Sequence, residues 1–288
     1  TGVATTAGDI ATEVLVLAVG HSARDVFEFL PRYEVKMAAK PFSVGFRVEH
    51  LQREVDRALY HEAAGHPVLP PGEYQLSTHV GDRGVYTFCM CPGGQVVAAA
   101  SEEEHLCTNG MSYHARDGEN ANAAVVVGVL DSDFNGDPAK AIAFQRELEA
   151  RVYKVHGGYV APAENIPSFL RGEGQLCVGS VRPTYPRGVA ATDLGSLLPN
   201  HLTSALREGL ARFEKKQTGF CAPDAILTGL ETRTSSPVRI ARRADTCSET
   251  IEGLYPCGEG AGYAGGIVSA AVDGLRVAQN ILETYSFS

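Results

Sequence analysis

The sequence has no tryptophan, three methionines and no excess of basic residues. Its 25 lysines and arginines are outnumbered by 34 aspartates and glutamates, which leaves a net charge of −9. Because nucleic acids and acidic membrane surfaces are bound by basic faces, this balance argues against both kinds of partner. No apolar run approaches the ~18 residues that a membrane-spanning helix needs, and no signal peptide is recognisable.

Other common signatures are absent as well. Seven cysteines are an odd number in a chain of 288 residues, so a disulfide framework is not expected, and a reducing cytoplasm is the simplest location. The sequence contains no G-x-S-x-G, H-E-x-x-H or P-loop, which argues against the common hydrolase and kinase classes. With 44% hydrophobic and 20% charged residues, the chain has the composition of an ordinary globular protein.

Glycine is abundant, with 31 residues, and it clusters near the end of the chain. Residues 258–266 (GEGAGYAGG) connect a strand-like run to a helical pattern, and Gly260, Gly262 and Gly265 satisfy G-x-G-x-x-G. Such a turn lets the backbone approach a ligand at a helix N-terminus. Few residues follow Leu282, so an independent nucleotide-binding βαβ unit is not expected here. The alternative is a glycine-rich turn that serves helix packing alone.

The order of elements predicts two domains. Residues 14–18 (VLVLA) are a continuous apolar run, typical of a strand buried on both faces, and the last helix follows a second such strand. We therefore expect an α/β domain from residues 1–40 and 231–288, interrupted by an α+β insert at 41–230. Within the insert the patterns predict strands at 43–49 and 123–130, a hairpin of 84–90 with 95–100, and helices from Pro138 and near Pro199. Because the chain opens inside a strand-turn-strand pattern without an initiator Met, we expect that an upstream part has been removed.

Five blocks of sequence resemble one family of flavoproteins. They are residues 14–25 (VLVLAVGHSARD), 88–101 (FCMCPGGQVVAAAS), 109–122 (NGMSYHARDGENAN), 227–240 (LTGLETRTSSPVRI) and 253–274 (GLYPCGEGAGYAGGIVSAAVDG). In this order they resemble the bacterial FAD-dependent dehydrogenases known as NAD(FAD)-utilising dehydrogenases, which have two dinucleotide folds. Members of that family begin with a strand–GxGxxG–helix unit that holds the ADP half of FAD. This chain lacks such a unit near its start, so it resembles the C-terminal part of a longer flavoprotein.

The resemblance implies both fold and function. The two chain ends would be the remnant of a Rossmann-like FAD domain, and the insert would be a substrate domain with antiparallel sheet and helices. The whole protein would transfer hydride between FAD and an unidentified small-molecule substrate, with NAD(P)H as electron partner. This chain alone would bind FAD weakly or not at all, because the N-terminal FAD-binding unit is its missing partner. The alternative is a non-catalytic binding or scaffold module with a degenerate flavin site.

The resemblance also assigns residues to the cofactor. The backbone of residues 258–266 would face the pyrophosphate, the ribityl chain and the flavin, and Glu259 stands where related proteins place an aspartate that binds ribityl hydroxyls. Arg233 and the neighbouring hydroxyls would contact the flavin ring or an acidic substrate, or else form an ordinary domain crossing. The cofactor-binding candidates are Ala18, Gly20, His21, Ser235, Gly258, Glu259, Gly260, Ala261, Gly262, Tyr263, Gly265, Gly266 and Ile267.

The catalytic candidates besides Arg233 lie in the insert. Cys89 and Cys91 form a C-x-C that would place both thiols on one face of a strand. They fit a redox dithiol, metal ligation together with Cys107 or His105, or two small buried residues; no metal is expected, because C-x-x-C is absent. A thiol chemistry at this pair would be sensitive to alkylation.

A polar loop supplies the other two candidates. His114 would be an acid or base, and Arg116 an anion clamp. The alternative is a solvated turn in which Arg116 pairs with Asp117.

Overall fold

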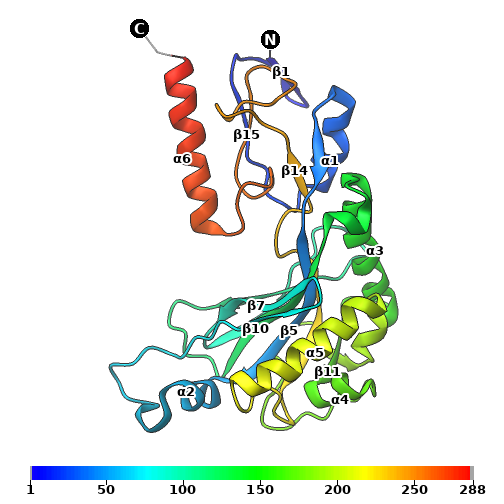
Figure 1. Cartoon of the computed structure of the whole chain (residues 1–288), viewed down its shortest axis with the longest axis vertical. Helices are drawn as coiled ribbons and strands as arrows, with labels where there is room; N and C mark the ends of the chain where they lie inside the picture. The colour runs from blue at the N-terminus through cyan, green and yellow to red at the C-terminus, as the bar shows by residue number, and fades with distance from the viewer. Residues whose placement is uncertain (1, 286–288) are drawn as a thin grey trace. The chain divides into compact units, whose positions relative to one another are not determined.

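A computed structural model of the chain describes residues 2–285 (Figure 1). The chain divides into two compact units, which are described separately. Unit 1 comprises Thr1–Phe42, Leu130–Phe144 and Arg233–Ser288, and unit 2 comprises Ser43–Val129 and Gln145–Thr232. Segment 130–144 belongs to unit 1, whereas the division made from the sequence assigned it to the insert. The reason lies in packing, because Ile142 joins a hydrophobic cluster built from the two chain ends.

Unit 2 is built on a seven-stranded mixed sheet with the strand order β12-β11-β13-β5-β10-β7-β6. β11 and β12 are parallel, while β11/β13, β13/β5, β10/β7 and β6/β7 are antiparallel. β5 and β10 lie at the centre and are buried almost throughout, and they overlap the strands predicted at residues 43–49 and 123–130. The strands are β5 (Phe42–Leu51), β6 (Ser77–Val80), β7 (Arg83–Cys91), β10 (Asn120–Val129), β11 (Ala161–Asn165), β12 (Val189–Ala191) and β13 (Ile226–Glu231).

The hairpin predicted around residues 91–94 is wrong. β8 (Gly94–Ala98) does not pair with β7 but with β9 (Thr108–Ser112), in a separate antiparallel pair. Both edges of β7 are occupied by β10 and β6, so no edge is left for β8. Gly93 has a φ of 51°, which helps the chain leave the plane of the first sheet.

Helices cover the sheet of unit 2, and their positions follow from the sequence. α5 (Asn200–Lys216) buries a stripe of apolar side chains at helical spacing, namely Leu202, Leu206, Leu210 and Phe213. Gly209 of α5 lies so close to Val85 of β7 that a Cβ atom there would overlap it. α3 (Pro138–Val155) starts as predicted, with the Asp137 carboxylate accepting the Ala139 N–H at 2.9 Å. The remaining helical elements are α2 (Gln52–Tyr60), α4 (Ile166–Arg171), η2 (His61–Ala63) and η4 (Leu194–Leu197).

Unit 1 contains small sheets and the long last helix. Its parallel pair joins β3 and β15, and antiparallel pairs join β4 with β14 and β1 with β2. Phe27, Val238 and Ile240 belong to its main hydrophobic cluster. The elements are β1 (Gly2–Thr5), β2 (Gly8–Ala11), β3 (Leu15–Leu17), α1 (Arg24–Phe29), η1 (Leu30–Tyr33), β4 (Met37–Ala39), η3 (Asp131–Phe134), β14 (Val238–Ile240), β15 (Leu254–Pro256) and α6 (Ile267–Thr284).

The expectation that the first apolar run is buried on both faces is wrong for this chain. Leu15 and Val16 of β3 are 37% and 44% exposed. β3 pairs with β15 on one edge, and among the described residues no strand pairs with its other edge. A run of this kind would be buried only if further elements covered it.

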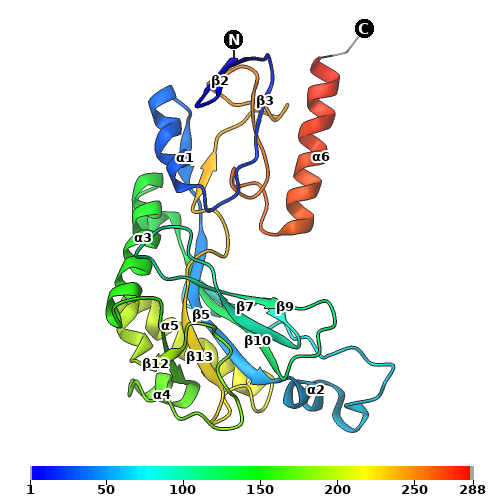
Figure 2. The same cartoon turned by 180° about the vertical axis from the view of Figure 1, so that it is seen from behind.

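α6 is exposed in the same way (Figures 1 and 2). Its apolar face carries Val268 and Leu275, which are 77% and 68% exposed, and Leu282 and Ile267 are exposed as well. The buried positions of the helix are Asp273 and Val277. Unit 1 therefore presents an uncovered apolar helix face and an uncovered strand edge.

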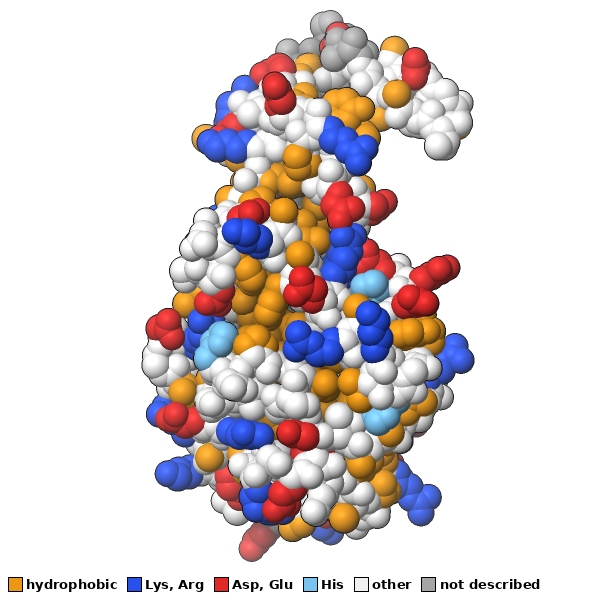
Figure 3. All heavy atoms as spheres, turned by 90° about the vertical axis from the view of Figure 1, so that its right-hand side faces the viewer, with side chains coloured by type: hydrophobic (Ala, Val, Ile, Leu, Met, Phe, Trp, Pro, Cys, Tyr) orange, Lys and Arg blue, Asp and Glu red, His pale blue; other side chains and the backbone are white. Residues whose placement is uncertain are grey.

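The surface carries charges of both signs. On the face drawn in Figure 3, acidic and basic side chains are interspersed, so the described residues of that face form no patch of one sign. Among residues 2–285, no helix combines the length and the hydropathy that a membrane crossing requires.

Candidate functional site

Two turns of unit 1 meet at one place. Residues 18–20 follow β3, and residues 258–266 follow β15; because the two strands are parallel and adjacent, both turns leave the same edge. Gly260 lies against Gly20 so closely that a Cβ atom on Gly260 would overlap the Gly20 carbonyl oxygen. Ligands of α/β sheets bind at the carboxyl ends of parallel strands, so this is the position where a ligand site is expected.

Polar contacts hold the two turns together. His21 Nδ1 lies 3.2 Å from Glu259 Oε1, which links the first turn to the second. Ser236 Oγ lies 3.0 Å from the carbonyl oxygen of Gly260, to which it donates a hydrogen bond. Arg233 Nη1 donates to Ser22 Oγ at 3.2 Å. Arg233 thus belongs to unit 1 with the cofactor-binding candidates, close to the turn after β3.

Two further basic residues lie near these turns, and no sequence pattern pointed to the first of them, Lys40. Lys40 is partly buried, and burial lowers its pKa; Arg239 lowers it further, while Glu259 raises it. The Arg239 guanidinium also lies 5.2 Å from the centre of the Tyr263 ring. Lys40 lies outside the five blocks of the family resemblance, and only the fold brings it to Glu259.

A buried aspartate anchors the glycine-rich turn. Asp273 of α6 accepts the backbone N–H of Gly258 at 2.8 Å, and it pairs with Arg242 at 2.5 and 3.0 Å. Burial would raise the pKa of Asp273, but the Arg242 hydrogen bond and the Gly258 N–H hold it below its usual value. A single aspartate within a helical pattern carries no spacing signal, so this positioning role of Asp273 was not predicted.

Part of the turn is open to solvent. A Cβ atom on Gly20, Gly265 or Gly266 would meet nothing within 4 Å. The turn leads into α6 at Ile267, and the first N–H groups of a helix have no partner within the helix. The backbone is therefore accessible at a helix N-terminus, where an anion is stabilised.

The close approach of the two turns makes a testable prediction. Gly260→Ala should lower the free energy of unfolding by about 1–3 kcal/mol, because the new methyl group meets backbone that cannot move aside easily. Gly265→Ala is the matched control, with open space at its Cβ position and an expected effect within about 0.5 kcal/mol. Urea denaturation followed by circular dichroism measures both, and equal losses would contradict the contact.

In unit 2 the structure gathers Cys89 and Cys91 around a buried ion pair. Arg47 of β5 donates to Glu231 of β13 through Nε at 2.5 Å and through Nη2 at 3.1 Å. Its Nη1 donates to the carbonyl oxygen of Cys89 at 2.8 Å and to Asn122 Oδ1 at 3.1 Å. Burial alone would lower the pKa of Arg47, but Glu231 raises it, so the guanidinium stays charged.

Cys89 and Cys91 do not share one face of a regular strand as predicted. The pairing of β7 with β10 is irregular between Asn122 and Ala124, and Cys89 has a φ of 45°. As a result Cys89 is exposed and Cys91 is buried. A bulge of this kind separates the environments of the two thiols.

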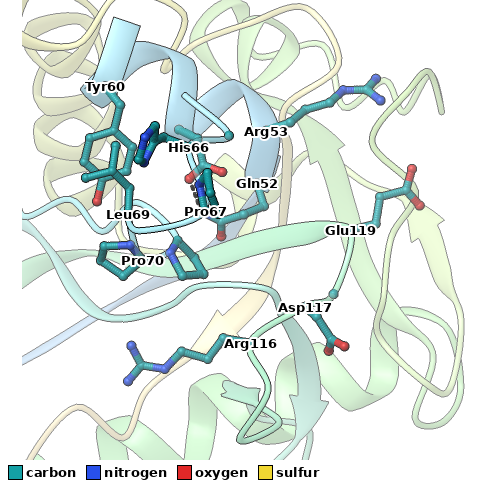
Figure 4. A pocket seen from close by; sticks show the side chains of 14 residues that line it. Gln52, Arg53, Tyr60, His66, Pro67, Leu69, Pro70, Arg116, Asp117 and Glu119 are labelled. Carbon is teal, nitrogen blue, oxygen red and sulfur yellow. Dashed lines mark hydrogen bonds between the residues drawn. The ribbon is translucent and has the colours of Figure 1, made fainter. Parts of the chain in front are cut away.

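The polar loop of His114 and Arg116 is exposed. Arg116 Nη1 lies 2.6 Å from Glu73 Oε1, a partner from a distant loop rather than the neighbouring Asp117. Arg116 lines an open cavity of about 480 Å³ together with Gln52, Asp56 and Glu119 (Figure 4). His114 does not line it. The side chains that line the cavity carry charges of both signs, and their arrangement does not point to a particular reaction.

No group of three or more His, Cys, Asp or Glu side chains within residues 2–285 is arranged to hold a metal ion. The alternative in which Cys107 or His105 completes a metal site with the C-x-C has no support from the described residues.

Comparison with known proteins defines the family. Residues 41–234 match the family described as "FAD-dependent protein, C-terminal domain-like", which is more than half of the chain. The chain belongs to this family. The match supports the predicted membership of an FAD-dependent family. The narrower assignment to dehydrogenases stays a prediction.

A relative extends the similarity over nearly the whole chain. A protein of Clostridium beijerinckii (strain ATCC 51743 / NCIMB 8052), described as an uncharacterized protein, is 49% identical over 281 residues. The aligned part is 96% of this chain and 53% of the relative. The chain therefore spans about half the length of this relative.

The groups at the two turns of unit 1 match those that bind the middle part of FAD. The pyrophosphate of FAD needs backbone N–H groups and close approach, and open glycines before the N-terminus of α6 supply both. Carboxylate and imidazole groups at Glu259 and His21 are suited to ribityl hydroxyls. The donor set at the two turns thus fits the middle part of FAD.

Proposed function

We propose that this chain is the C-terminal part of an FAD-dependent oxidoreductase that transfers hydride between flavin and a small-molecule substrate, with NAD(P)H as electron partner. In this proposal the candidate turns of unit 1 hold part of the FAD, and unit 2 serves the substrate. The family match supports the FAD, and the oxidoreductase activity is the inference drawn from it.

One observation carries the proposal. The turn after β3 and the glycine-rich turn after β15 leave adjacent parallel strands, and Gly20 and Gly260 touch there. A turn with five glycines is costly in conformational entropy, and a packing role alone does not require the open backbone at Gly265 and Gly266. A phosphate-containing ligand explains both features.

The chain's residues would bind and orient the cofactor rather than react. The N-terminus of α6 would face negative charge, and Glu259, fixed by His21, would accept hydrogen bonds from hydroxyl groups. Burial lowers the pKa of Lys40 and Glu259 opposes this effect, and a protonated Lys40 would add positive charge beside the bound cofactor. When bound, FAD supplies the hydride chemistry at its N5 position.

The uncovered surface of unit 1 fits a partner from the same protein. The relative is nearly twice as long as this chain, so a second half of comparable size exists there. We infer that the corresponding half of this protein covers the apolar face of α6 and the open edge of β3. That half would supply the unit that holds the ADP portion of FAD.

The absorption spectrum of the full-length protein tests the proposal. Purified protein should be yellow with two visible bands, and the bands should bleach when NADH or NADPH is added without oxygen. The nucleotide that bleaches the bands faster identifies the electron donor. A colourless protein that stays colourless after incubation with FAD would overturn the proposal in favour of a binding module.

A further inference from the structure

Cys89 occupies an unusual place at the end of β7. Its backbone has a φ of 45°, in the left-handed region that a non-glycine residue rarely adopts, and its side chain is exposed. Cys91, two residues on, is buried opposite Asn122 of β10. Because strained residues cluster at functional sites, the backbone conformation of Cys89 points to a chemical role for this bulge.

The bulge brings the two thiols together. In a regular strand, residues i and i+2 are separated by about 6.6–6.8 Å, the upper limit for Cα atoms joined by a disulfide. The turn at Cys89 shortens this path: the Cys91 sulfur lies 3.4 Å from the Cys89 carbonyl oxygen, and Arg47 Nη1 contacts both that oxygen and the Cys91 sulfur, at 2.8 and 4.0 Å. A disulfide between Cys89 and Cys91 therefore needs little movement of the backbone.

The surroundings separate the roles of the two thiols. The neighbouring Cys91 thiol lowers the pKa of Cys89 to about 6, and Arg47 adds to this effect although burial opposes it. The Cys89 thiol and burial raise the pKa of Cys91. Glu231 also lies near the two cysteines, and its carboxylate accepts a hydrogen bond from Arg47. Cys89 is thus the thiolate, and Cys91 keeps its proton.

A spare donor lies next to Cys91. Asn122, its register partner, is fully buried, and its Oδ1 accepts from Arg47. The Nδ2 amide of Asn122 has no hydrogen-bond partner among the described residues. An unsatisfied buried donor is costly, and it can bind the sulfur anion that forms when Cys91 loses its proton.

We propose that Cys89 and Cys91 form a dithiol–disulfide couple that reduces an organic disulfide. The Cys89 thiolate attacks one sulfur of the substrate, which breaks the substrate S–S bond and releases one thiolate. Cys91 then attacks the Cys89 sulfur of the mixed disulfide and releases the second substrate thiol, which takes up the Cys91 proton. The protein pair is oxidised by two electrons, and the substrate disulfide is reduced to two thiols. The step needs no flavin, so it stands apart from the proposed function.

Alkylation of the unmodified chain tests the first half of this proposal. Cys177, the other exposed cysteine, is the internal reference, and peptide mass mapping after brief exposure to iodoacetamide gives both rates. At pH 6 we expect Cys89 to react about 10-fold faster than a thiol of ordinary pKa, because its larger thiolate fraction outweighs its weaker nucleophilicity. Its rate should rise half-way near pH 6. Equal rates at Cys89 and Cys177 would overturn the assignment.

Reaction with dithiodipyridine tests the second half. In a Cys177→Ser background, the chain should release two thiones from the pair, and the peptide with Cys89 and Cys91 should lose two hydrogens. Cys91→Ser should stop at the mixed disulfide on Cys89, with one thione released from the site. Cys89→Ser should abolish the fast phase while circular dichroism stays unchanged. A mixed disulfide that persists at Cys89 with Cys91 present, or an absent intramolecular disulfide, would overturn the proposal without bearing on flavin binding.

Discussion

Arg47→Ala is expected to lower the free energy of unfolding by about 3–5 kcal/mol, the largest loss predicted for a single side chain of unit 2. The variant removes the partner of Glu231 and leaves that carboxylate buried without a counter-charge. It also removes hydrogen bonds to Asn109, Asn122 and the Cys89 carbonyl oxygen, which tie β5 to β7, β9 and β10. Urea denaturation followed by circular dichroism measures the loss.

The pH dependence of this loss identifies its cause. Burial raises the pKa of Glu231, and in the native chain Arg47 offsets this effect. Without Arg47 the folded state favours the protonated carboxyl, so the stability of the variant should fall as the pH rises through the raised pKa. The loss should therefore be smaller at a pH of about 5 than at a pH of about 8. A loss that does not depend on pH would indicate a packing defect instead.

Two controls separate the buried pair from ion pairs in general. Arg171→Ala breaks an exposed pair with Glu173 and should leave the unfolding transition unchanged, because water screens such pairs. The double variant Arg47→Met, Glu231→Leu should recover much of the stability, because no charge is left buried. If the double variant were as unstable as Arg47→Ala, the unpaired carboxylate would not be the cause.

Local patterns predicted the regular elements well. α3 and α5 were predicted from apolar spacing and from the Asp137–Pro138 start, β5 from the alternating pattern of residues 43–49, and β10 from the apolar run of residues 123–130. These features depend on residues within a few positions of each other. The mixed α/β architecture follows from them, whereas the Rossmann-like remnant stays a proposal.

Features that depend on distant pairing were not predicted. The pairing of β8 with β9 depends on which strands occupy the edges of β7, and the sequence around residues 91–94 carries no information on this. Arg47 and Glu231 are 184 residues apart, so the local sequence around either residue does not predict their salt bridge. The exposure of β3 was not predicted, because a continuous apolar run indicates burial but does not say which elements of the chain would cover it.

The candidate site was predicted in part. The two glycine-containing turns were recognised from the flavoprotein resemblance, and the structure brings them together at Gly20 and Gly260. Their supports were not recognised: Asp273 holds Gly258, and Ser236 holds Gly260. Such positioning residues act through single hydrogen bonds from other elements and leave no spacing pattern. Cys89 was selected for its C-x-C motif, but its exposure and left-handed backbone appear only in the fold.

The second large effect concerns FAD itself. This chain alone should bind FAD at least about 100-fold more weakly than the full-length protein, a difference of about 2.8 kcal/mol. The turns of unit 1 would contact the middle of the cofactor, while the contacts to its ADP portion would come from the half that this chain lacks. Equilibrium dialysis or quenching of flavin fluorescence measures both affinities. Tight stoichiometric binding of FAD by this chain would contradict the prediction.

Comparison with FMN, which lacks the AMP portion, makes the test specific. The full-length protein should prefer FAD strongly, whereas this chain alone should bind FAD and FMN alike. Leu275→Glu on the exposed face of α6 should move the full-length protein toward the affinity of this chain, because a buried carboxylate would separate the two halves. Gln279→Glu, at another exposed position of the same helix, should change little. If both variants kept the full affinity, the apolar face of α6 would not be the surface that the second half covers.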